Sequence, residues 1–366
     1  MERPLRVLLV SPLPPPAGGI ARWTSLVTGY AGGRGDVRIA VVDTALRWRS
    51  IHNNSSAARI AAGFPQLIGC SMRLLEQARK GLVDVVHINS SGQFGIVRDY
   101  LLARIARSFR IPVVYHIRFG RIPDIAEKRT REWRAFAAVA RRAQAVIALD
   151  RDTQVAVAQR IPSVPVELVP NCVDPASVKS GTSRALPPGN ANTALFVGWV
   201  IPAKGVRELF EVWHEASPAD WRLIVVGSYD EAYISSLNLP PAARSRIDLR
   251  GELPHQDVLA LMGQCRFLVH PSHTEGFPNV IAEAMILGKP VLSTAVGAIP
   301  DMLSDGCGVV IPPQDAGQLA EAIRAMIANE ESRERMGRSA ARKAHAEYTV
   351  GGVFARYLDI WKKAAG

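Results

Sequence analysis

The sequence has few cysteines and no long apolar run, and both absences narrow the class of protein. Its four cysteines lie far apart, with no Cys-x-x-Cys or Cys/His ligand spacing, so we expect reduced, mostly buried thiols and neither disulfides nor a metal site. No apolar stretch approaches the roughly 18 residues that span a bilayer. The apolar segment at residues 5–10 is too short for the core of a signal peptide. We therefore expect a cytoplasmic protein.

Neither charge nor glycine and proline dominate the composition. Charged residues make up 21% of the chain and apolar residues 48%, which excludes disordered, collagen-like and disulfide-scaffold proteins. A chain of 366 residues is long enough for two domains of ordinary size.

Acidic residues are scarce in the first half of the chain. Residues 1–174 contain 25 Lys and Arg against 13 Asp and Glu, a balance of +12, and the remaining 19 against 20 give −1, which together make the net charge of +11. A basic half indicates an anionic partner, such as phospholipid headgroups, a phosphorylated acceptor or nucleic acid. The alternative is an arginine-rich surface that serves only solubility. No segment resembles a nucleic-acid-binding module, so we expect no nucleic-acid partner.

Short apolar runs alternate with longer helical segments along the chain, a pattern that indicates doubly wound parallel sheets. Residues 174–192 are rich in Pro, Gly and Ser without periodicity, so we expect an interdomain linker there. We expect strands at residues 6–10, 37–42, 83–88, 112–116, 145–148, 166–169, 193–197, 222–226, 247–249, 266–269, 290–293 and 308–311. We expect helices at residues 57–80, 100–110, 125–142, 205–216, 257–264, 279–287 and 316–329.

The segment that carries the clearest chemistry runs from Glu275 to Glu283 and follows the strand expected at 266–269. Pro278 suits the first position of a helix, because its missing N–H would be unpaired there. The first backbone amides from Phe277 to Val280, with N–H groups at Phe277, Asn279 and Val280, would then form an anion site suited to phosphate. Glu275 would lie in the loop beside it, and Glu283 on the second turn could accept two hydroxyl hydrogen bonds. The alternative is an ordinary helix N-terminus with a solvated glutamate.

A second glycine-bearing loop follows the strand expected at 193–197. Gly198 allows close backbone approach, and Lys204 can extend a positive charge to a phosphate. A surface lysine before a helix is the alternative.

The order of these motifs resembles the retaining GT-B glycosyltransferases of family 4 (glycosyl transferases group 1). The second half carries their Gly-x5-Lys-Gly, Pro-Ser, Glu-x7-Glu, Glu-Ala-Met-x2-Gly-x-Pro-Val and Gly-x2-Pro-acid segments at 198–205, 271–272, 275–283, 283–291 and 297–301. The first half carries a glycine loop at 14–20, two strand-end histidine segments at 84–87 and 113–116, and a Pro-Asn-x-Val-Asp segment at 170–174. Cys172 stands where the family usually has glycine.

This resemblance implies an α/β fold of the GT-B type, with two Rossmann-like doubly wound parallel-sheet domains that face each other across a cleft. An acceptor-binding domain would span 1–175, with a C-terminal helix at 351–364 packed back on it, and a donor-binding domain would span 190–350. The implied activity is metal-independent retaining transfer of a hexosyl group from a UDP- or GDP-sugar, without a cofactor. The acceptor would be a lipid-linked or growing glycan in cell-surface polysaccharide biosynthesis. A non-catalytic GT-B assembly partner is the alternative.

The resemblance also implies residue roles. Glu275 would contact the transferred sugar, His116 would contact the sugar or the leaving group, and Glu283 would bind the ribose hydroxyls. Preorganised amides and a lysine would stabilise the departing diphosphate without a metal. The remaining donor-binding residues would be Gly18, Gly19, Gly198, Lys204, Gly276, Phe277, Pro278, Asn279 and Val280.

One position departs from the family pattern. Trp199 stands where the family commonly has arginine, and an indole cannot neutralise phosphate. Arg207, Arg118 and Arg22 are conceivable substitutes. We expect the indole to stack on a substrate ring or to pack in the core.

The segment 125–142 is amphipathic when drawn as one helix. Ile125, Trp133, Phe136, Val139 and Ala140 share one face, and Arg131, Arg134, Arg141 and Arg142 share the other. With the +12 balance and the segment 47–49 (Arg-Trp-Arg), this predicts peripheral association with an anionic membrane, on the inner face of the cytoplasmic membrane. A core-packed helix with a solvated basic face is the simpler interpretation of the helix itself.

Overall fold

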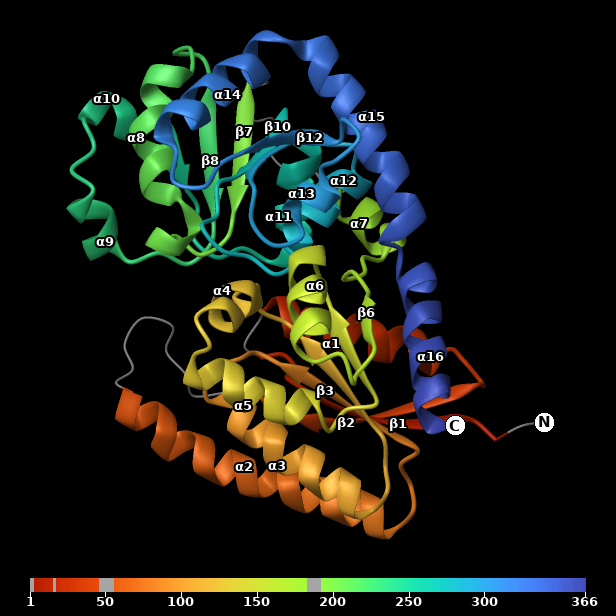
Figure 1. Ribbon diagram of the computed structural model, residues 1–366. Helices are drawn as coiled ribbons and strands as arrows, with labels where there is room; N and C mark the ends of the chain where they lie inside the picture. Colours follow the sequence, from red (N-terminus) through yellow and green to blue (C-terminus); the bar gives the residue numbers. More distant parts are fainter. Residues whose placement is uncertain (1–2, 16–17, 46–55, 183–191) are drawn as a thin grey trace. The chain divides into compact units, whose positions relative to one another are not determined.

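The computed structural model describes residues 3–15, 18–45, 56–182 and 192–366, with only the backbone described for 56–64. The chain divides into two compact units (Figure 1). The first contains Met1–Cys172 and Val350–Gly366, and the second contains Val173–Thr349.

The first unit is built on a parallel sheet of six described strands in the order β2-β1-β3-β4-β5-β6. Strands β3, β4 and β5 are buried along their whole length, as expected for a sheet covered by helices on both faces. The strand order reverses between β1 and β3, the position at which open α/β sheets bind ligands. The strands are β1 Leu5–Ser11, β2 Val37–Asp43, β3 Val85–Ser90, β4 Val113–Ile117, β5 Ala145–Ala148 and β6 Val166–Leu168.

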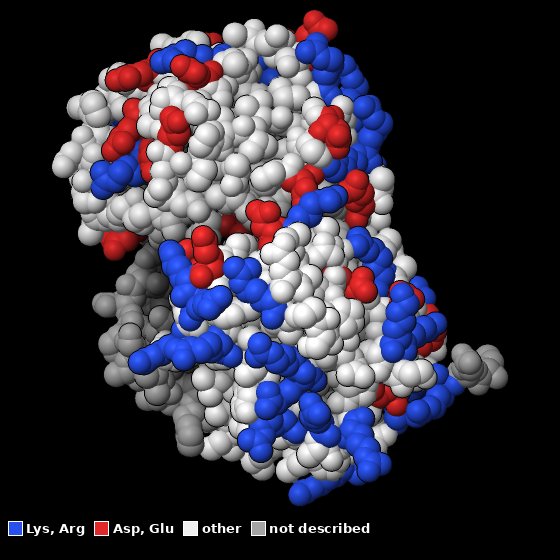
Figure 2. Space-filling view, viewed as in Figure 1, with Lys and Arg blue, Asp and Glu red and all other residues white. Residues whose placement is uncertain are grey.

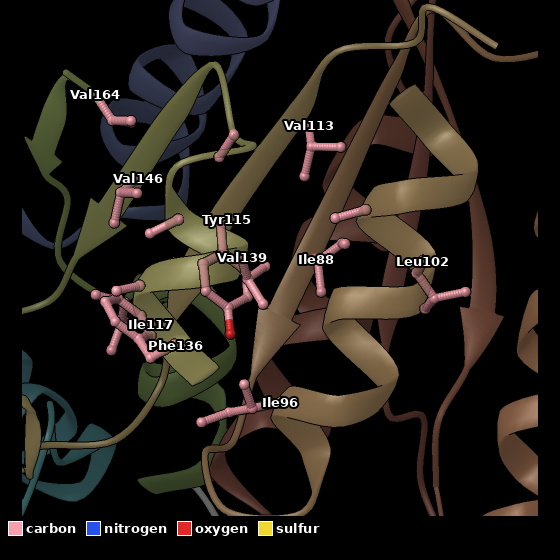
Figure 3. Packing of buried hydrophobic residues seen from close by; sticks show 14 of the residues in the cluster. Ile88, Ile96, Leu102, Val113, Tyr115, Ile117, Phe136, Val139, Val146 and Val164 are labelled. Carbon is pink, nitrogen blue, oxygen red and sulfur yellow. The ribbon is translucent and has the colours of Figure 1, made fainter. Parts of the chain in front are cut away.

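Two apolar layers hold helices against the two faces of this sheet. Helices α2, α3 and α5 contribute to one layer, in which Ile96 and Leu102 of α3 and Phe136 of α5 point toward the strands (Figure 3). Helices α1 and α16 contribute to the other layer, which includes Trp23 and Trp361. The helices of this unit are α1 Gly19–Gly32, α2 Ser56–Arg79, α3 Gly95–Ser108, α4 Ile122–Glu127, α5 Arg131–Ala140, α6 Arg151–Arg160 and α16 Val350–Ala365.

The single helix predicted for residues 125–142 is wrong, because the chain forms two helices, α4 and α5. Arg129 adopts a left-handed conformation with φ of 48°, which ends the first helix. The Thr130 side chain then accepts a hydrogen bond from the Trp133 N–H and begins the second. The apolar face expected from Trp133 onward is buried in the core.

The second unit repeats the architecture, with six described strands in the order β12-β11-β10-β7-β8-β9. Its strands are β7 Thr193–Val197, β8 Arg222–Val226, β9 Ile247–Leu249, β10 Phe267–His270, β11 Val291–Thr294 and β12 Gly308–Ile311. Its helices are α7 Pro175–Thr182, α8 Val206–Ala216, α9 Glu231–Ser236, α10 Pro241–Arg244, α11 His255–Gln264, α12 Asn279–Ile286, α13 Ile299–Met302, α14 Ala316–Ala328 and α15 Glu330–Glu347, with a 3-10 turn η1 at Pro202–Lys204.

The linker predicted for residues 174–192 is wrong in its first part, which forms helix α7. This helix packs against α11 so closely that a Cβ on Gly181 would lie 2.7 Å from the Leu259 side chain. Small residues therefore serve close helix packing here rather than an irregular linker. Residues 183–191 lie outside the described residues.

All four cysteines are free and buried, which confirms the prediction of buried thiols. Within the described ranges, no helix combines the length and the apolar character that a membrane-spanning helix needs.

Candidate active site

Three loops of the second unit meet at the carboxyl ends of its strands, and two glycines permit the contact. Gly205 has φ of 66°, and a Cβ there would lie 1.9 Å from the Pro271 carbonyl oxygen. Gly297 has φ of 54°, and a Cβ there would lie 2.4 Å from the Glu275 carbonyl oxygen. Both glycines are therefore required, and the loops after β7, β10 and β11 form one compact site.

The centre of this site is the carboxylate of Glu275. Its Oε1 lies 2.5 Å from Lys204 Nζ, 2.8 Å from His270 Nε2 and 2.9 Å from Ser272 Oγ. Burial raises its pKa, but the hydrogen bond and charge of His270 and the charge of Lys204 outweigh burial and lower the pKa to about 2. The side chain is 13% exposed. Glu275 is therefore an anion at neutral pH, and Lys204, predicted to act on a phosphate, contacts it directly.

His270 is a site residue that the sequence analysis did not single out. It ends β10 and stacks on Phe196 with ring centroids 6.0 Å apart. Its Nδ1 is buried and has no partner among the described side chains and backbone. The signal in the sequence was its position at a strand end, directly before Pro271 and Ser272.

Helix α12 presents its N-terminus next to the Glu275 loop and begins at Asn279, the predicted start, but Pro278 precedes the helix instead of occupying its first position. Pro278 is the residue before the helix, with φ of −76° and ψ of 109°, and the helix begins at Asn279. Phe277 is buried, and its ring is roughly perpendicular to that of Tyr348, with ring centroids 5.4 Å apart. The first N–H groups of an α-helix have no partner within the helix, and its dipole favours an anion there. The geometry fits the predicted anion site.

Glu283 lies on α12, and only 3% of its surface is exposed. Its Oε1 lies 3.4 Å from Nε2 of His255, the first residue of α11. His255 is a second neighbour that the sequence analysis missed, because the two residues are far apart in the sequence and come together only in the fold. The role predicted for Glu283, binding ribose, stays a prediction.

Trp199 is 43% exposed, so its predicted packing in the core is wrong. The alternative, stacking on a substrate ring, stays a prediction. Of the arginines suggested as substitutes, Arg207 lies 3.4 Å from Glu211 on the exposed side of α8. Arg22 lies on α1 in the first unit.

Arg118, the third suggested substitute, is held by residues of the first unit. Its Nε donates to Asn89 Oδ1 at 2.7 Å, its Nη1 donates to Asn171 Oδ1, and its guanidinium lies 3.8 Å above the Trp23 ring. Burial lowers its pKa to about 10. Asn89 in turn donates to Ser11, so Arg118 belongs to a polar network at the carboxyl ends of β1, β3 and β4.

His116 is buried in the same region, with the rings of Trp23, His87 and Tyr357 around it. Burial, and then the charge of Arg118, lower its pKa well below 6.5. The imidazole is therefore neutral at physiological pH. Its predicted contact with the sugar or the leaving group stays a prediction.

The two predicted glycine elements lie at strand ends in separate units. Gly18 directly precedes α1 in extended backbone conformation, and Gly19 is the first residue of that helix. Gly198 follows β7, and its N–H donates to the Val226 carbonyl of the neighbouring strand at 2.9 Å. Lys204, Glu275 and Gly276 are thus together in the second unit, and Gly18, Gly19 and His116 lie in the first. The segment 47–49 lies outside the described residues.

The fold is that of the GT-B glycosyltransferases, as known structures show. Sucrose-phosphate synthase from Thermosynechococcus elongatus superimposes with a TM-score of 0.75 at 18% identity, covering 98% of each chain. The Anabaena protein HepE in complex with UDP-glucose superimposes with a TM-score of 0.72 at 18% identity, covering 98% of this chain and all of the other. At this level of identity the likeness shows the fold alone.

The chain belongs to the glycosyl transferases group 1, with a family 4 first half. The family described as glycosyl transferases group 1 matches residues 182–343, and glycosyltransferase family 4 matches residues 18–177. An uncharacterized glycosyltransferase of Methanocaldococcus jannaschii is 33% identical over 179 residues, 47% of this chain and 49% of that one. The O-antigen chain mannosyltransferase C of Escherichia coli is 26% identical over 46% of each chain. The chain thus matches about half the length of these curated relatives.

Proposed function

We propose that the protein transfers a sugar from a UDP- or GDP-sugar to a hydroxyl of a lipid-linked or growing glycan in cell-surface polysaccharide biosynthesis. The observation that carries this proposal is the anionic Glu275, paired with Lys204 and placed beside the N-terminus of α12. Structures of the same fold that bind UDP-glucose and a relative that builds O-antigen support it.

The second unit is the proposed donor-binding domain. A nucleoside diphosphate gains negative charge as the bond to the sugar breaks, and preorganised N–H dipoles and a lysine stabilise that charge without a metal ion. We assign this role to the N–H groups of Phe277, Asn279 and Val280, to the Gly198 loop and to Lys204, with the loop at Gly18 and Gly19 as a further contact. Lys204 has three N–H protons, so it can hold Glu275 and a phosphate oxygen at once.

Glu275 has a different role because it is ionised. A carboxylate with a pKa of about 2 accepts hydrogen bonds from sugar hydroxyls and stabilises positive charge at the reacting carbon, but it has no proton to donate. We assign it to the transferred sugar in a retaining reaction, Glu283 to the ribose hydroxyls, and His116 to the sugar or the leaving group. No cofactor enters this scheme.

Nucleotide-sugar turnover tests the proposal. The protein is incubated with a panel of UDP- and GDP-sugars, and binding is read as a thermal shift; a ligand at 100 times its Kd adds about 2.7 kcal/mol of apparent stability. Release of nucleoside diphosphate is then measured with a lipid-linked glycan acceptor, with Glu275→Gln as the inactive control. Binding without turnover in wild type would instead indicate the non-catalytic assembly partner.

The anionic membrane surface remains part of the proposed function, with α2 and α3 in place of the predicted helix face. Of nine exposed large apolar side chains among the residues whose surface is described, seven lie between residues 68 and 109. Val97 and Leu101 share one face of α3, and Ile68 and Met72 are one turn apart on α2. Figure 2 shows Lys and Arg gathered over α3 and α5 of this unit. Exposed apolar side chains on helices that also carry exposed cations fit an anionic lipid surface.

A further inference from the structure

A series of buried hydrogen bonds in the first unit, here called the relay, begins in helix α16. Trp361 of α16 donates its Nε1–H to Nδ1 of His87 at 2.9 Å. Nε2 of His87 lies 3.1 Å from Nδ1 of His116 on the neighbouring strand β4. All three side chains are completely buried.

The donor-to-acceptor direction of the relay determines which nitrogen of each imidazole carries the proton. An indole nitrogen only donates, so Nδ1 of His87 must be the acceptor. The neutral His87 ring then carries its proton on Nε2 and donates it to Nδ1 of His116. By the same argument, the His116 proton lies on its Nε2.

A doubly protonated, charged imidazolium is incompatible with the hydrogen bonds of the relay. A second proton on His87 would point its Nδ1–H at the indole N–H, and a second proton on His116 would point its Nδ1–H at the His87 N–H. Burial, and then the charge of Arg118, lower the pKa of His87 to about 3, in agreement with a neutral ring.

The relay ends at His116, in a hydrogen-bond donor for which the described residues provide no acceptor. Nε2 of His116 is buried and has no partner in the described parts of the protein. Nη2 of Arg118 is buried and unpartnered in the same sense. Both side chains lie against Trp23: the His116 ring is perpendicular to the indole with ring centroids 5.6 Å apart, and the Arg118 guanidinium lies 3.8 Å from the ring centroid. Unpaired buried donors are rare in native proteins, so each of these two groups requires an explanation.

We propose that Trp361 and His87 are positioning residues that hold His116 as an Nε2–H donor, directed at an oxygen of the sugar or of the leaving phosphate. The proposal rests on the proposed function, which assigns His116 to that ligand, and it adds what His116 does there. The proton already occupies Nε2, so His116 donates a hydrogen bond and does not act as a base. The last helix of the chain thereby sets the chemical form of a site residue.

The protonation state is measured directly on the full-length protein. Long-range proton–nitrogen NMR correlation of protein labelled with nitrogen-15 histidine distinguishes protonated from unprotonated ring nitrogens, and His116→Gln assigns the signals. At pH 7 we expect a protonated Nε2 and an unprotonated Nδ1 on His116. A proton on Nδ1, on both nitrogens, or an average of the two tautomers in wild type would overturn the proposal.

A pair of tryptophan variants tests the origin of the relay. Trp361→Phe removes the N–H and keeps a ring, and we expect His116 to become a mixture of tautomers. Trp213→Phe is the matched control, because Trp213 is also completely buried and its indole N–H has no partner in the described structure. It should leave the His116 signals unchanged. An unchanged His116 in Trp361→Phe, with the fold retained, would overturn the role of Trp361.

Turnover provides the second readout. His116→Gln keeps an N–H at a similar reach, and we expect kcat within tenfold of wild type, whereas His116→Leu should lose on the order of 10² in kcat. His87→Gln accepts and donates like the histidine and should retain kcat, whereas His87→Leu should lower kcat with the donor KM within about twofold. Equal losses in His116→Gln and His116→Leu would overturn the donor role. Absence of turnover in wild type would refute the proposed function and leave the NMR test of the relay intact.

Discussion

The two units share one fold and prepare their ligand groups in opposite ways. In the second unit, the site is charged: Glu275 is an anion because Lys204 and His270 surround its carboxylate. In the first unit, the histidines are neutral because apolar packing removes water from them. A strand end can therefore present a charge held by countercharges or a neutral dipole held by packing. The former depends on pairs of charges and the latter on the fit of aromatic rings.

Removal of Lys204 tests the charged site most severely. We expect Lys204→Ala to lower kcat by about 10² to 10³, as for the loss of one preorganised donor at a developing anion. Lys363, an exposed lysine that pairs with Asp359 on α16, supplies the control, and Lys363→Ala should leave kcat unchanged. Release of nucleoside diphosphate from the donor sugar is the measurement.

The same position offers a cycle with Trp199. Because Trp199 is exposed, Trp199→Arg should be tolerated by the fold. If the indole stacks on a substrate ring, as we expect, the added charge rescues nothing in Lys204→Ala. A partial rescue in the double-mutant cycle would instead place residue 199 at the phosphates.

The pH dependence of stability tests the charged site next. The folded pKa of Glu275, about 2, lies below the unfolded value of 4.5, so its pairing stabilises the fold above pH 4.5 and this stabilisation is lost as pH falls toward 2. The full effect is on the order of 3 kcal/mol. Urea unfolding at a series of pH values should show a smaller acid loss in Glu275→Gln than in wild type. Parallel curves for the two proteins would refute the pairing.

Glu283→Ala tests whether the nucleotide and the transferred sugar are bound by different carboxylates. We expect Kd for the free nucleoside diphosphate to rise about tenfold or more, as for a lost hydrogen bond to a charged group. Glu275→Ala is the comparison, and it should lower kcat with little change in this Kd. Calorimetry measures both, and an unchanged Kd in Glu283→Ala would contradict the ribose assignment.

The sequence alone predicted the sheets well because strands that are buried on both faces read as apolar runs. The run at 145–148 matches β5 and the run at 193–197 matches β7 at both ends. The prediction failed at Arg129 and Thr130, where one left-handed residue and one capping side chain divide a continuous periodic pattern into two helices. It also failed at 175–182, where a glycine serves close helix packing.

The candidate site was predictable as far as chain order determines it. Glu275, Lys204 and the start of α12 come from loops at strand ends, which parallel topology brings together. The contacts of His255 with Glu283 and of Trp361 with His87 depend on how segments far apart in the sequence come together in the fold. Hydrogen-bond direction between two histidines has no signature in residue spacing.

The smallest expected effect concerns the surface of the first unit. Its association with anionic vesicles should be electrostatic, on the order of 1 kcal/mol for each engaged Arg, and weakened by salt.

Arg104 and Arg107 are exposed on α3 beside the apolar face. We expect Arg104→Gln with Arg107→Gln to reduce pelleting with anionic vesicles. Val97→Ser should reduce the part that survives high salt, because that part comes from apolar burial. Arg324→Gln on α14 of the second unit is the control and should change neither. Equal pelleting with anionic and neutral vesicles would show that the basic surface serves solubility alone.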